Sequence, residues 1–133
     1  MILLDTTFLI DLLKEREHAV EKANELPYRD SLATTYVNVY ELLLGVYSLG
    51  GIDYDKKLRE AELLLDKLHV LKLDMQSAVL SAKTGGNLSL KGSIIGDTDN
   101  MIAGIALANN INTVVTRDKE HFSRIKGLKI ESY

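Results

Sequence analysis

Four acidic residues stand at junctions where an apolar segment of this 133-residue chain begins or ends. Asp5 directly follows the apolar residues 1–4, and Asp118 follows a second apolar run that ends at Thr116. A polar residue just past a buried parallel strand lies at the carboxyl end of that strand, where open α/β sheets place their ligands. Carboxylates gathered at such an edge would form a metal site. The candidate catalytic and metal-binding residues are Asp5, Glu41, Asp99 and Asp118.

Each of the four acids also has an ordinary structural explanation. Asp5 and Asp99 could cap helices, and Asp118 could form a turn. Glu41 could be a helix glutamate that reaches water from the border of an apolar stripe. A right-handed βαβ arrangement nevertheless brings the carboxyl ends of parallel strands, and the helices that start there, to one edge. This topology favours a shared site over unrelated surface charges.

The chemistry of such a site favours a hard cation. Clustered carboxylates repel one another, and a divalent cation stabilises them all in the charged form. The chain has no cysteine and lacks the His-Glu-x-x-His pattern of many zinc sites. Oxygen ligands without converging histidines suit Mg²⁺ or Mn²⁺ better than Zn²⁺. We therefore expect Mg²⁺ or Mn²⁺ as the cofactor.

Length and composition set the broader class. A chain of this length is expected to form a single domain, residues 1–133, with a sizeable core. No apolar stretch is long enough to span a membrane, and the first residues lack the features of a secretion signal, so we expect a cytoplasmic protein with no membrane partner. The net charge of −3 argues against a broad basic surface for nucleic acid, although a local or metal-mediated contact stays open.

Apolar runs alternate with longer segments of helical period, which is typical of βαβ units and predicts an α/β fold with a mostly parallel, five-stranded sheet. The expected strands are residues 2–4, 31–35, 70–73, 113–116 and 128–131. The expected helices are residues 8–25, 37–49, 54–68 and 74–83, with a further helix from about residue 97. Residues 87–96 are expected to form a loop. Pro27 would end the first helix, and Gly85 and Gly86 would end the fourth.

Four short motifs follow one another along the chain: LDTTFLID at residues 4–11, ELLLG at 41–45, DNMIA at 99–103, and VTRD at 115–118 with His121 and Phe122 after it. As an ordered set over essentially the whole chain, they resemble the PIN-domain ribonucleases, and most closely the VapC-like toxins of bacterial and archaeal toxin–antitoxin pairs. The resemblance implies a three-layer α/β/α PIN-like fold. It also implies metal-dependent hydrolysis of RNA phosphodiester bonds.

The resemblance assigns roles residue by residue. The family's acidic quartet falls on Asp5, Glu41, Asp99 and Asp118. Thr7 and Thr116 are the hydroxyl residues beside the first and the last acid. Asp97 lies two positions before Asp99, where it either caps a helix or shares the role of that residue.

In the mechanism that the resemblance implies, a bound ion activates water for in-line attack and stabilises the charge of the transition state. Asp5 and Asp99 would bind this ion directly. Asp118 would act directly or through water at a second ion, and Glu41 would orient water or support the ligands. Many relatives carry asparagine at the position of Asp118, so one ion and two ions both stay open.

Basic residues close to Asp118 could hold the RNA. The candidates are Arg117, Lys119, Arg124 and Lys126, joined by Lys14 and Arg16. A solvated charged face would explain them equally well. His121 is expected to pack or to cap beside Phe122, because the metal chemistry needs no histidine base.

The resemblance also implies protein partners. The family forms homodimers and is inhibited by an antitoxin whose peptide tail lies across the active-site groove. Core or subunit contact, rather than base stacking, is expected for three tyrosines at roughly helical spacing: Tyr36, Tyr40 and Tyr47.

Other classes fit less well. A phosphatase of the haloacid dehalogenase type needs a second aspartate where Thr7 stands, and a response-regulator receiver needs an acidic pair after the first strand, which is missing. The glycine motifs of ATP and dinucleotide binding are absent. Two interpretations within the fold stay open: a PIN nuclease of RNA processing outside a toxin–antitoxin pair, and a non-catalytic RNA- or protein-binding PIN module. The intact acidic set argues against the second.

Overall fold

The computed structural model describes residues 1–27, 31–51 and 54–133, in which strands and helices alternate. The strands are Ile2–Leu4 (β1), Leu32–Thr35 (β2), His69–Leu71 (β3), Thr113–Val115 (β4) and Lys129–Glu131 (β5). The helices are Thr6–Leu13 (α1), Glu17–Glu25 (α2), Tyr36–Tyr47 (α3), Tyr54–Leu65 (α4), Met75–Leu90 (α5), Asp97–Ala108 (α6) and Lys119–Ser123 (α7). Every predicted strand is present within two residues of its predicted bounds.

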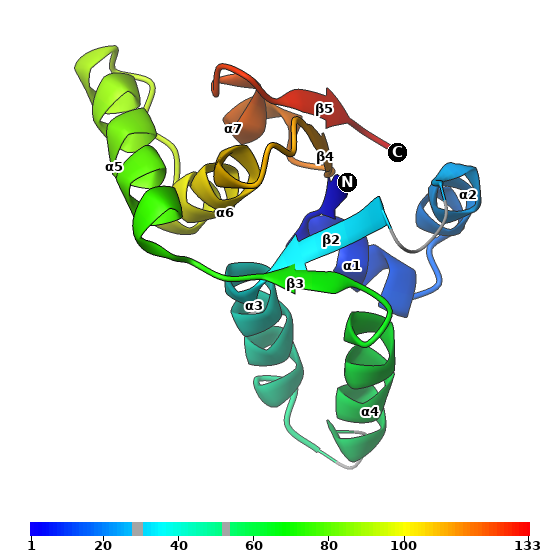
Figure 1. The fold of residues 1–133 in the computed structure, drawn as a ribbon. Coiled ribbons are helices and arrows are strands. Elements are labelled where there is room, and N and C mark those ends of the chain that lie inside the picture. The colour runs from blue at the N-terminus through cyan, green and yellow to red at the C-terminus, as the bar shows by residue number, and fades with distance from the viewer. Residues whose placement is uncertain (28–30, 52–53) are drawn as a thin grey trace.

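The strands form one parallel sheet in the order β3-β2-β1-β4-β5. In β1, Leu3 pairs with Ala33 of β2 on one side and with Val114 of β4 on the other. The chain winds outward from β1 through β2 and β3, then returns to the other side of β1 to add β4 and β5 (Figure 1). The predicted parallel sheet is confirmed. The carboxyl ends of β1 and β4 are neighbours where the winding reverses, which is where such sheets form ligand sites.

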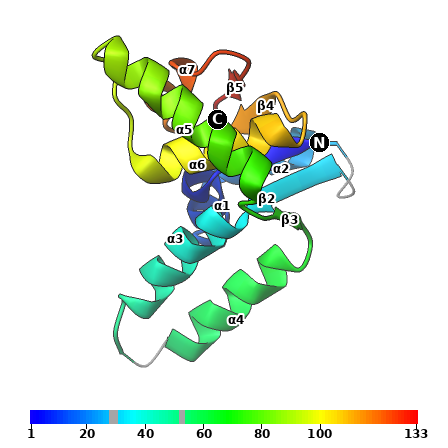
Figure 2. The ribbon, with the colours of Figure 1, turned by 60° about the vertical axis from the view of Figure 1, so that its left-hand side comes forward.

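Helices cover both faces of the sheet and bury an apolar core on each side. Successive side chains of a strand point to opposite faces, so Leu3 and Val114 join one core whereas Leu4 and Val115 join the other. The first core includes residues of α5, α6 and α7, and the second includes residues of α1, α2, α3 and α4. Figure 2 shows α5 with α6 on one side and the α3–α4 hairpin on the other. The expected three-layer α/β/α arrangement is confirmed.

The single helix predicted over residues 8–25 is wrong, because the structure divides it into α1 and α2. Between them, Glu15 adopts the left-handed conformation with φ 52°. This turn changes which face is buried: Ala19 is completely buried, whereas Val20 is 40% exposed. A continuous helix would have placed Val20 on the apolar stripe. The break lets α2 turn back and pack its own face against the core.

The predicted end of α5 is also wrong. The glycines of the sequence suggest a stop near Lys83 and a loop over residues 87–96, but the helix continues through Gly85 and Gly86 to Leu90. The loop therefore begins only after Leu90.

Close packing of α5 against α6 explains Gly85, whereas a side chain at Gly86 would meet open space. A Cβ atom on Gly85 would lie 3.1 Å from the Asn100 Nδ2 atom of α6. Gly104 allows the same close approach from the α6 side, because a Cβ atom there would lie 2.7 Å from the Ser77 carbonyl oxygen of α5. Glycine thus serves the approach of two helices instead of a helix end.

Periodicity could not reveal α7, because a helix of 5 residues is little more than one turn. Asp118 caps it by accepting the backbone N–H of His121 at 3.3 Å. This turn places the His121 ring back over Asp118. No helix in the described parts of the chain is long and apolar enough to cross a membrane.

Candidate active site

Asp5 lies where the winding of the sheet reverses. It follows β1, and its N–H donates to the Val115 carbonyl oxygen of β4 at 3.1 Å. Its side chain caps α1, which is a favoured role for a short polar residue in extended conformation before a helix. The cap holds the carboxylate at the sheet edge, where Asp5 is only 4% exposed.

Neutral side chains hold both oxygens of the Asp5 carboxylate. Thr7 and Thr116 donate their hydroxyls to Oδ2 over 3.0 Å and 2.8 Å. Asn38 donates its amide to Oδ1 over 3.1 Å. A buried polar group needs such partners, and here they also fix its direction. Asp5 is therefore positioned by the protein before any ligand arrives.

Asn38 also connects Asp5 to Glu41. The Asn38 side chain is completely buried, and its oxygen accepts the Thr35 hydroxyl at 2.7 Å. Its amide donates to Asp5 and to the Thr6 hydroxyl, the latter over 3.0 Å. Thr6 in turn donates to the Glu41 carboxylate. Glu41 lies three residues after Asn38 on α3. It thus belongs to the same hydrogen-bonded network.

A second group of potential metal ligands comes from α6 and α7. His121 Nδ1 lies 2.9 Å from Asp99 Oδ2 and 3.0 Å from Asp118 Oδ2. One ligand atom of each residue lies within 4.8 Å of the others. Gly96, not Asp99, is the N-cap of α6, so Asp99 lies in the first turn with its side chain turned toward α7. The His121 ring, expected only to pack or to cap, joins the acids.

The charged form of the Asp99 carboxyl is disfavoured in the folded protein. Burial raises the pKa of Asp99, and the nearby charges of Asp5 and Asp118 raise it further. The contact with His121 opposes this shift without cancelling it. The protein therefore leaves part of the negative charge at this position without compensation.

The donor set fits a divalent cation. Asp99, Asp118 and His121 already converge, and Thr116 ties them to Asp5 by accepting the Asp118 N–H at 3.0 Å while donating to Asp5. Carboxylate oxygens suit Mg²⁺ and Mn²⁺. The expectation of a site without histidine is corrected by His121, whose nitrogen is a better ligand for a transition-metal ion than for Mg²⁺.

The remaining predicted residues fall in different places. Thr7 and Thr116 contact Asp5 directly. Asp97 is exposed at the first position of α6 and is not part of the group formed with Asp99. The three tyrosines predicted for core or subunit contact are exposed on α3, which excludes a core role for Tyr36, Tyr40 and Tyr47.

The basic residues differ in how free they are. Lys119 is exposed. The Arg117 side chain is 63% exposed, and its Nη1 atom lies 3.1 Å from the Asp11 Oδ2 atom. Arg124 forms an ion pair with Glu120 in the preceding turn of α7. Arg117 and Lys119 are thus the more accessible cations beside the acids.

Sequence patterns did not assign to the site four polar residues that lie in or beside it: Thr6, Asn38, Asp11 and His121. Asn38 carried the clearest signal, because it stands three residues after Thr35, at capping-box spacing, in an apolar segment. His121 stands three residues after Asp118, which in a helix is contact distance. The contact between these two residues could not be predicted, because no sequence pattern indicates the short helix that follows Asp118.

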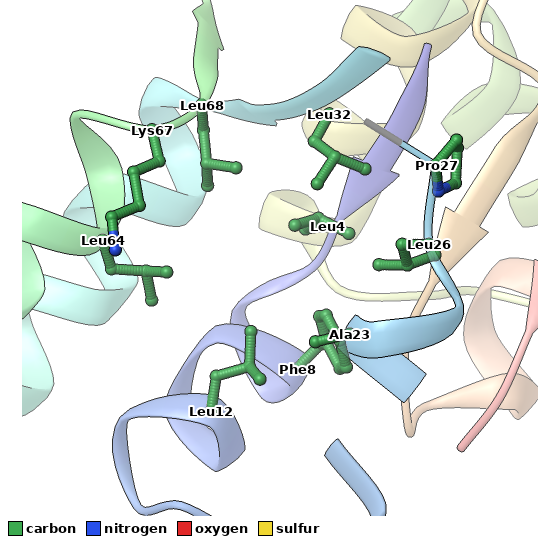
Figure 3. A pocket seen from close by; sticks show the side chains of 10 residues that line it. All are labelled: Leu4, Phe8, Leu12, Ala23, Leu26, Pro27, Leu32, Leu64, Lys67 and Leu68. Atoms are coloured by element: carbon green, nitrogen blue, oxygen red, sulfur yellow. The ribbon is translucent and has the colours of Figure 1, made fainter. Parts of the chain in front are cut away.

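An apolar pocket of about 640 Å³ lies between α1, α2, β2 and α4 (Figure 3). Its lining consists of Leu4, Phe8, Leu12, Ala23, Leu26, Pro27, Leu32, Leu64, Lys67 and Leu68. Apart from Lys67, these side chains offer no polar group that could take part in a reaction. The acidic edge of the sheet, in contrast, carries ionisable side chains that could take part in a reaction.

Comparisons with known proteins identify the family of this chain. Residues 2–128 match the PIN domain. The chain is 30% identical to Ribonuclease VapC1 of Haemophilus influenzae (strain R2866), over 98% of this chain and 96% of that protein. It is equally 30% identical to the tRNA(fMet)-specific endonuclease VapC of Salmonella typhimurium, with the same 98% and 96% coverage.

A solved structure shows the same architecture. The chain superposes on DNA-bound VapBC from Salmonella typhimurium with a TM-score of 0.85 and 30% identity, over 99% of this chain and 98% of that one. The similarity in sequence and the similarity in fold both extend over nearly the full length of the chain. The chain belongs to the PIN-domain family, and within it to the VapC-like proteins.

Proposed function

We propose that this protein is an endoribonuclease that hydrolyses RNA phosphodiester bonds with Mg²⁺ or Mn²⁺. The observation that carries the proposal is the group formed by Asp99, Asp118 and His121 next to the buried Asp5 carboxylate. Such a group has the donors and the uncompensated negative charge that a divalent cation requires. The names of the relatives, a ribonuclease and a tRNA endonuclease, support RNA as the substrate class.

The four acids would have different roles in binding the cation and in orienting water. Asp5 and Asp99 would bind the cation directly, and Asp118 would bind it directly or through water. When bound, the cation supplies the positive charge that activates water and stabilises the negative charge building up on the phosphate. Glu41, held by Thr6, would orient water at the edge of the site. These are the roles that the resemblance to the PIN-domain ribonucleases implies for the four acids.

Other side chains would support the ligands. Thr7 and Thr116 keep the Asp5 carboxylate in one orientation because both hydroxyls bind the same oxygen. Asp97, exposed at the start of α6, would add negative charge near the site without direct contact. Arg117, Lys119 and Arg124 would contact the RNA backbone as cations beside the acids.

In the cell we propose the role of toxin in a VapBC-type toxin–antitoxin pair, with a cognate antitoxin as protein partner. The solved relative is a VapBC complex, which supports such a partner. Residues 1–133 would act as one PIN-like domain in the cytoplasm, where the RNA substrate is found. A PIN nuclease of RNA processing outside such a pair is the alternative function.

A homodimer would cover the exposed aromatic face of α3. Tyr36, Tyr40, Leu44 and Tyr47 follow one another at helical spacing and are between 49% and 61% exposed. Two copies of such a face can pack against each other across a two-fold axis. Light scattering at increasing concentration would measure the dimer, and Tyr40→Glu should make the protein monomeric. An unchanged molecular mass in Tyr40→Glu would exclude this face as the interface.

Cleavage of RNA tests the central proposal. Labelled RNA should be cut by the wild type in Mg²⁺ or Mn²⁺, and cleavage should stop with EDTA and return when Mn²⁺ is added in excess. Asp5→Asn should be inactive, whereas Asp55→Asn, at an exposed position of α4, should cut like the wild type. Equal cleavage by the wild type and Asp5→Asn, or cleavage that persists in EDTA, would refute the metal-nuclease proposal.

The cellular role needs a separate experiment. Expression of a toxin should stop growth, expression of Asp5→Asn should not, and co-expression of a small adjacent gene product that binds the protein should restore growth. An active nuclease whose expression leaves growth unchanged would favour the RNA-processing alternative.

A further inference from the structure

Asp11 is a buried acid that the proposed chemistry does not use. It lies on α1, is 6% exposed, and accepts the Tyr133 hydroxyl at 2.9 Å on the same Oδ2 atom that lies 3.1 Å from Arg117 Nη1. A buried carboxylate without partners is strongly unfavourable, so both contacts are needed. Of the two partners, Arg117 is the more exposed, at 63% for its side chain, whereas Tyr133 is half-buried.

Tyr133 is the second side chain that holds Asp11. Its ring packs edge-on against Phe8, with ring centroids 4.8 Å apart and an interplanar angle of 65°. Burial and the bond to Asp11 raise the pKa of Tyr133, so its hydroxyl stays protonated and remains a donor. The Asp11 carboxylate therefore has little freedom to turn.

Arg117 is attached to α1 at two points. Its backbone N–H donates to the Thr7 hydroxyl at 3.1 Å, and its side chain pairs with Asp11 one turn later on the same helix face. Thr7 is itself bonded to Asp5, and Asp118 follows Arg117 in the chain. The guanidinium is thus held at the rim of the acidic site.

We propose that Asp11 is a positioning residue for the substrate: it holds the Arg117 guanidinium so that its free N–H groups bind a phosphate of the RNA strand beside the acidic site. This inference rests on the proposed ribonuclease function. A guanidinium offers five N–H donors in a rigid fork, and the contact with Asp11 is made through Nη1. An arginine that is already oriented loses less conformational freedom when it binds a phosphate.

Simple electrostatics and positioning make opposite predictions for Asp11→Asn. The substitution removes a negative charge near the RNA, so charge alone predicts tighter RNA binding. Positioning predicts weaker binding, because Arg117 loses its anchor while Tyr133 can still donate to the asparagine oxygen. The sign of the change therefore separates a positioning residue from a background charge.

The test compares KM and kcat for a fluorogenic RNA oligonucleotide in Mn²⁺. Arg117→Ala should raise KM about ten-fold with kcat within about two-fold, and Asp11→Asn should raise KM about three- to ten-fold. The double variant should match Arg117→Ala within about two-fold, because Asp11 acts only through Arg117. Arg59→Ala, an exposed arginine of α4, is the control and should leave KM unchanged.

Arg117→Lys keeps the charge but lacks the fork, and it does not depend on the folding of the Asp11 variant. Its KM should lie between those of the wild type and Arg117→Ala. Binding of the same oligonucleotide in EDTA at low salt, followed by fluorescence anisotropy, is independent of cleavage. Here Arg117→Ala should weaken the affinity for the oligonucleotide. The fall of log K with log salt should become less steep by about 0.7, because one phosphate contact is lost.

Several results would overturn the inference. They are tighter or unchanged RNA binding in Asp11→Asn, a wild-type KM in Arg117→Lys, or an Asp11→Asn effect that persists in the Arg117→Ala background. A wild type that binds RNA but does not cut it would refute the proposed nuclease function, while the anisotropy series would still decide the role of Asp11. A wild type that neither binds nor cuts RNA would refute both.

Discussion

The two sides of the acidic site are held in different ways. On the β1 side, both oxygens of Asp5 accept hydrogen bonds from neutral side chains, and the carboxylate is almost completely buried. On the α6–α7 side, the His121 ring contacts both Asp99 and Asp118. The first acid is complete without a ligand. The second pair includes Asp99, whose charged form is disfavoured by burial and by the neighbouring acids.

We infer from this difference that the two sides of the site have different roles in binding an ion. A fixed carboxylate gives a bound ion a defined position, because its orientation does not change when the ion arrives. Undercompensated carboxylates give the ion its binding free energy, at the expense of stability in the metal-free protein. Substitutions on the two sides should therefore affect stability in opposite directions while both reduce cleavage.

The largest expected effect is on the α6 side. Asp99→Asn should reduce kcat about 10³-fold or more, because a metal contact is worth several kcal/mol in the transition state. Asp97→Asn is the matched control: it removes the same charge from the same helix at an exposed position and should retain activity within about three-fold. Steady-state RNA cleavage measures both. Equal losses in the two variants would mean that Asp97 shares the role of Asp99.

On the β1 side, Asn38→Ala should lower the free energy of unfolding by about 1–3 kcal/mol, because Asp5 Oδ1 and the Thr6 hydroxyl lose the buried amide that donates to them. Cleavage should fall as well, since Asp5 and Glu41 both lose support. Urea unfolding measures the stability, with Asn24→Ala on the exposed surface of α2 as the control. A stability equal to that of the control would show that the network does not hold Asp5.

A smaller effect is expected for His121→Gln. Loss of the imidazole should weaken Mn²⁺ binding by about ten-fold, about 1.4 kcal/mol, while Mg²⁺ binding should change less. Isothermal titration with each ion gives the two affinities, and His18→Gln on α2, whose side chain is 82% exposed, is the control. An equal loss for both ions would assign His121 to orienting the acids instead of choosing the ion.

The smallest effect is a dependence on pH in metal-free protein. The raised pKa of Asp99 means that its charged form is disfavoured in the folded state, so the wild type loses stability as pH rises through that pKa. Asp99→Asn mimics the protonated form and should be the more stable protein at neutral pH. The difference should vanish by about pH 3, below the usual pKa of an aspartate, because Asp99 is then protonated in both folded and unfolded chains. Urea unfolding of both proteins in EDTA between about pH 3 and pH 8 would measure it.

The sequence sufficed for the sheet and for the positions of Asp5 and Asp118, because both depend on where short apolar strands end. It failed where tertiary packing overrides a local signal. Gly85 and Gly86 usually indicate a helix end, yet α5 continues through them because α6 needs the space beside Gly85. In the same way, Glu15 carries no breaker signal, but the chain turns there so that Ala19 can be buried.

The residues around the acids were harder to predict than the acids themselves. Asn38 and Thr6 join the site through contacts between α1 and α3 that no local pattern contains. His121 joins it through α7, whose single turn is too short for periodicity to show. An acid at a strand end can be found in one dimension, whereas the partners that orient it depend on how helices pack.

Thermal unfolding of the wild type and Asp99→Asn, each in EDTA and in Mn²⁺ at neutral pH, would show whether Asp99 is kept for a cation. We expect a reversal: Asp99→Asn unfolds at the higher temperature in EDTA, and the wild type unfolds at the higher temperature in Mn²⁺. Saturation at 100 times Kd would stabilise the wild type by about 2.7 kcal/mol. An equal shift by Mn²⁺ in both proteins, or a less stable Asp99→Asn in EDTA, would contradict the claim that Asp99 is kept for a cation.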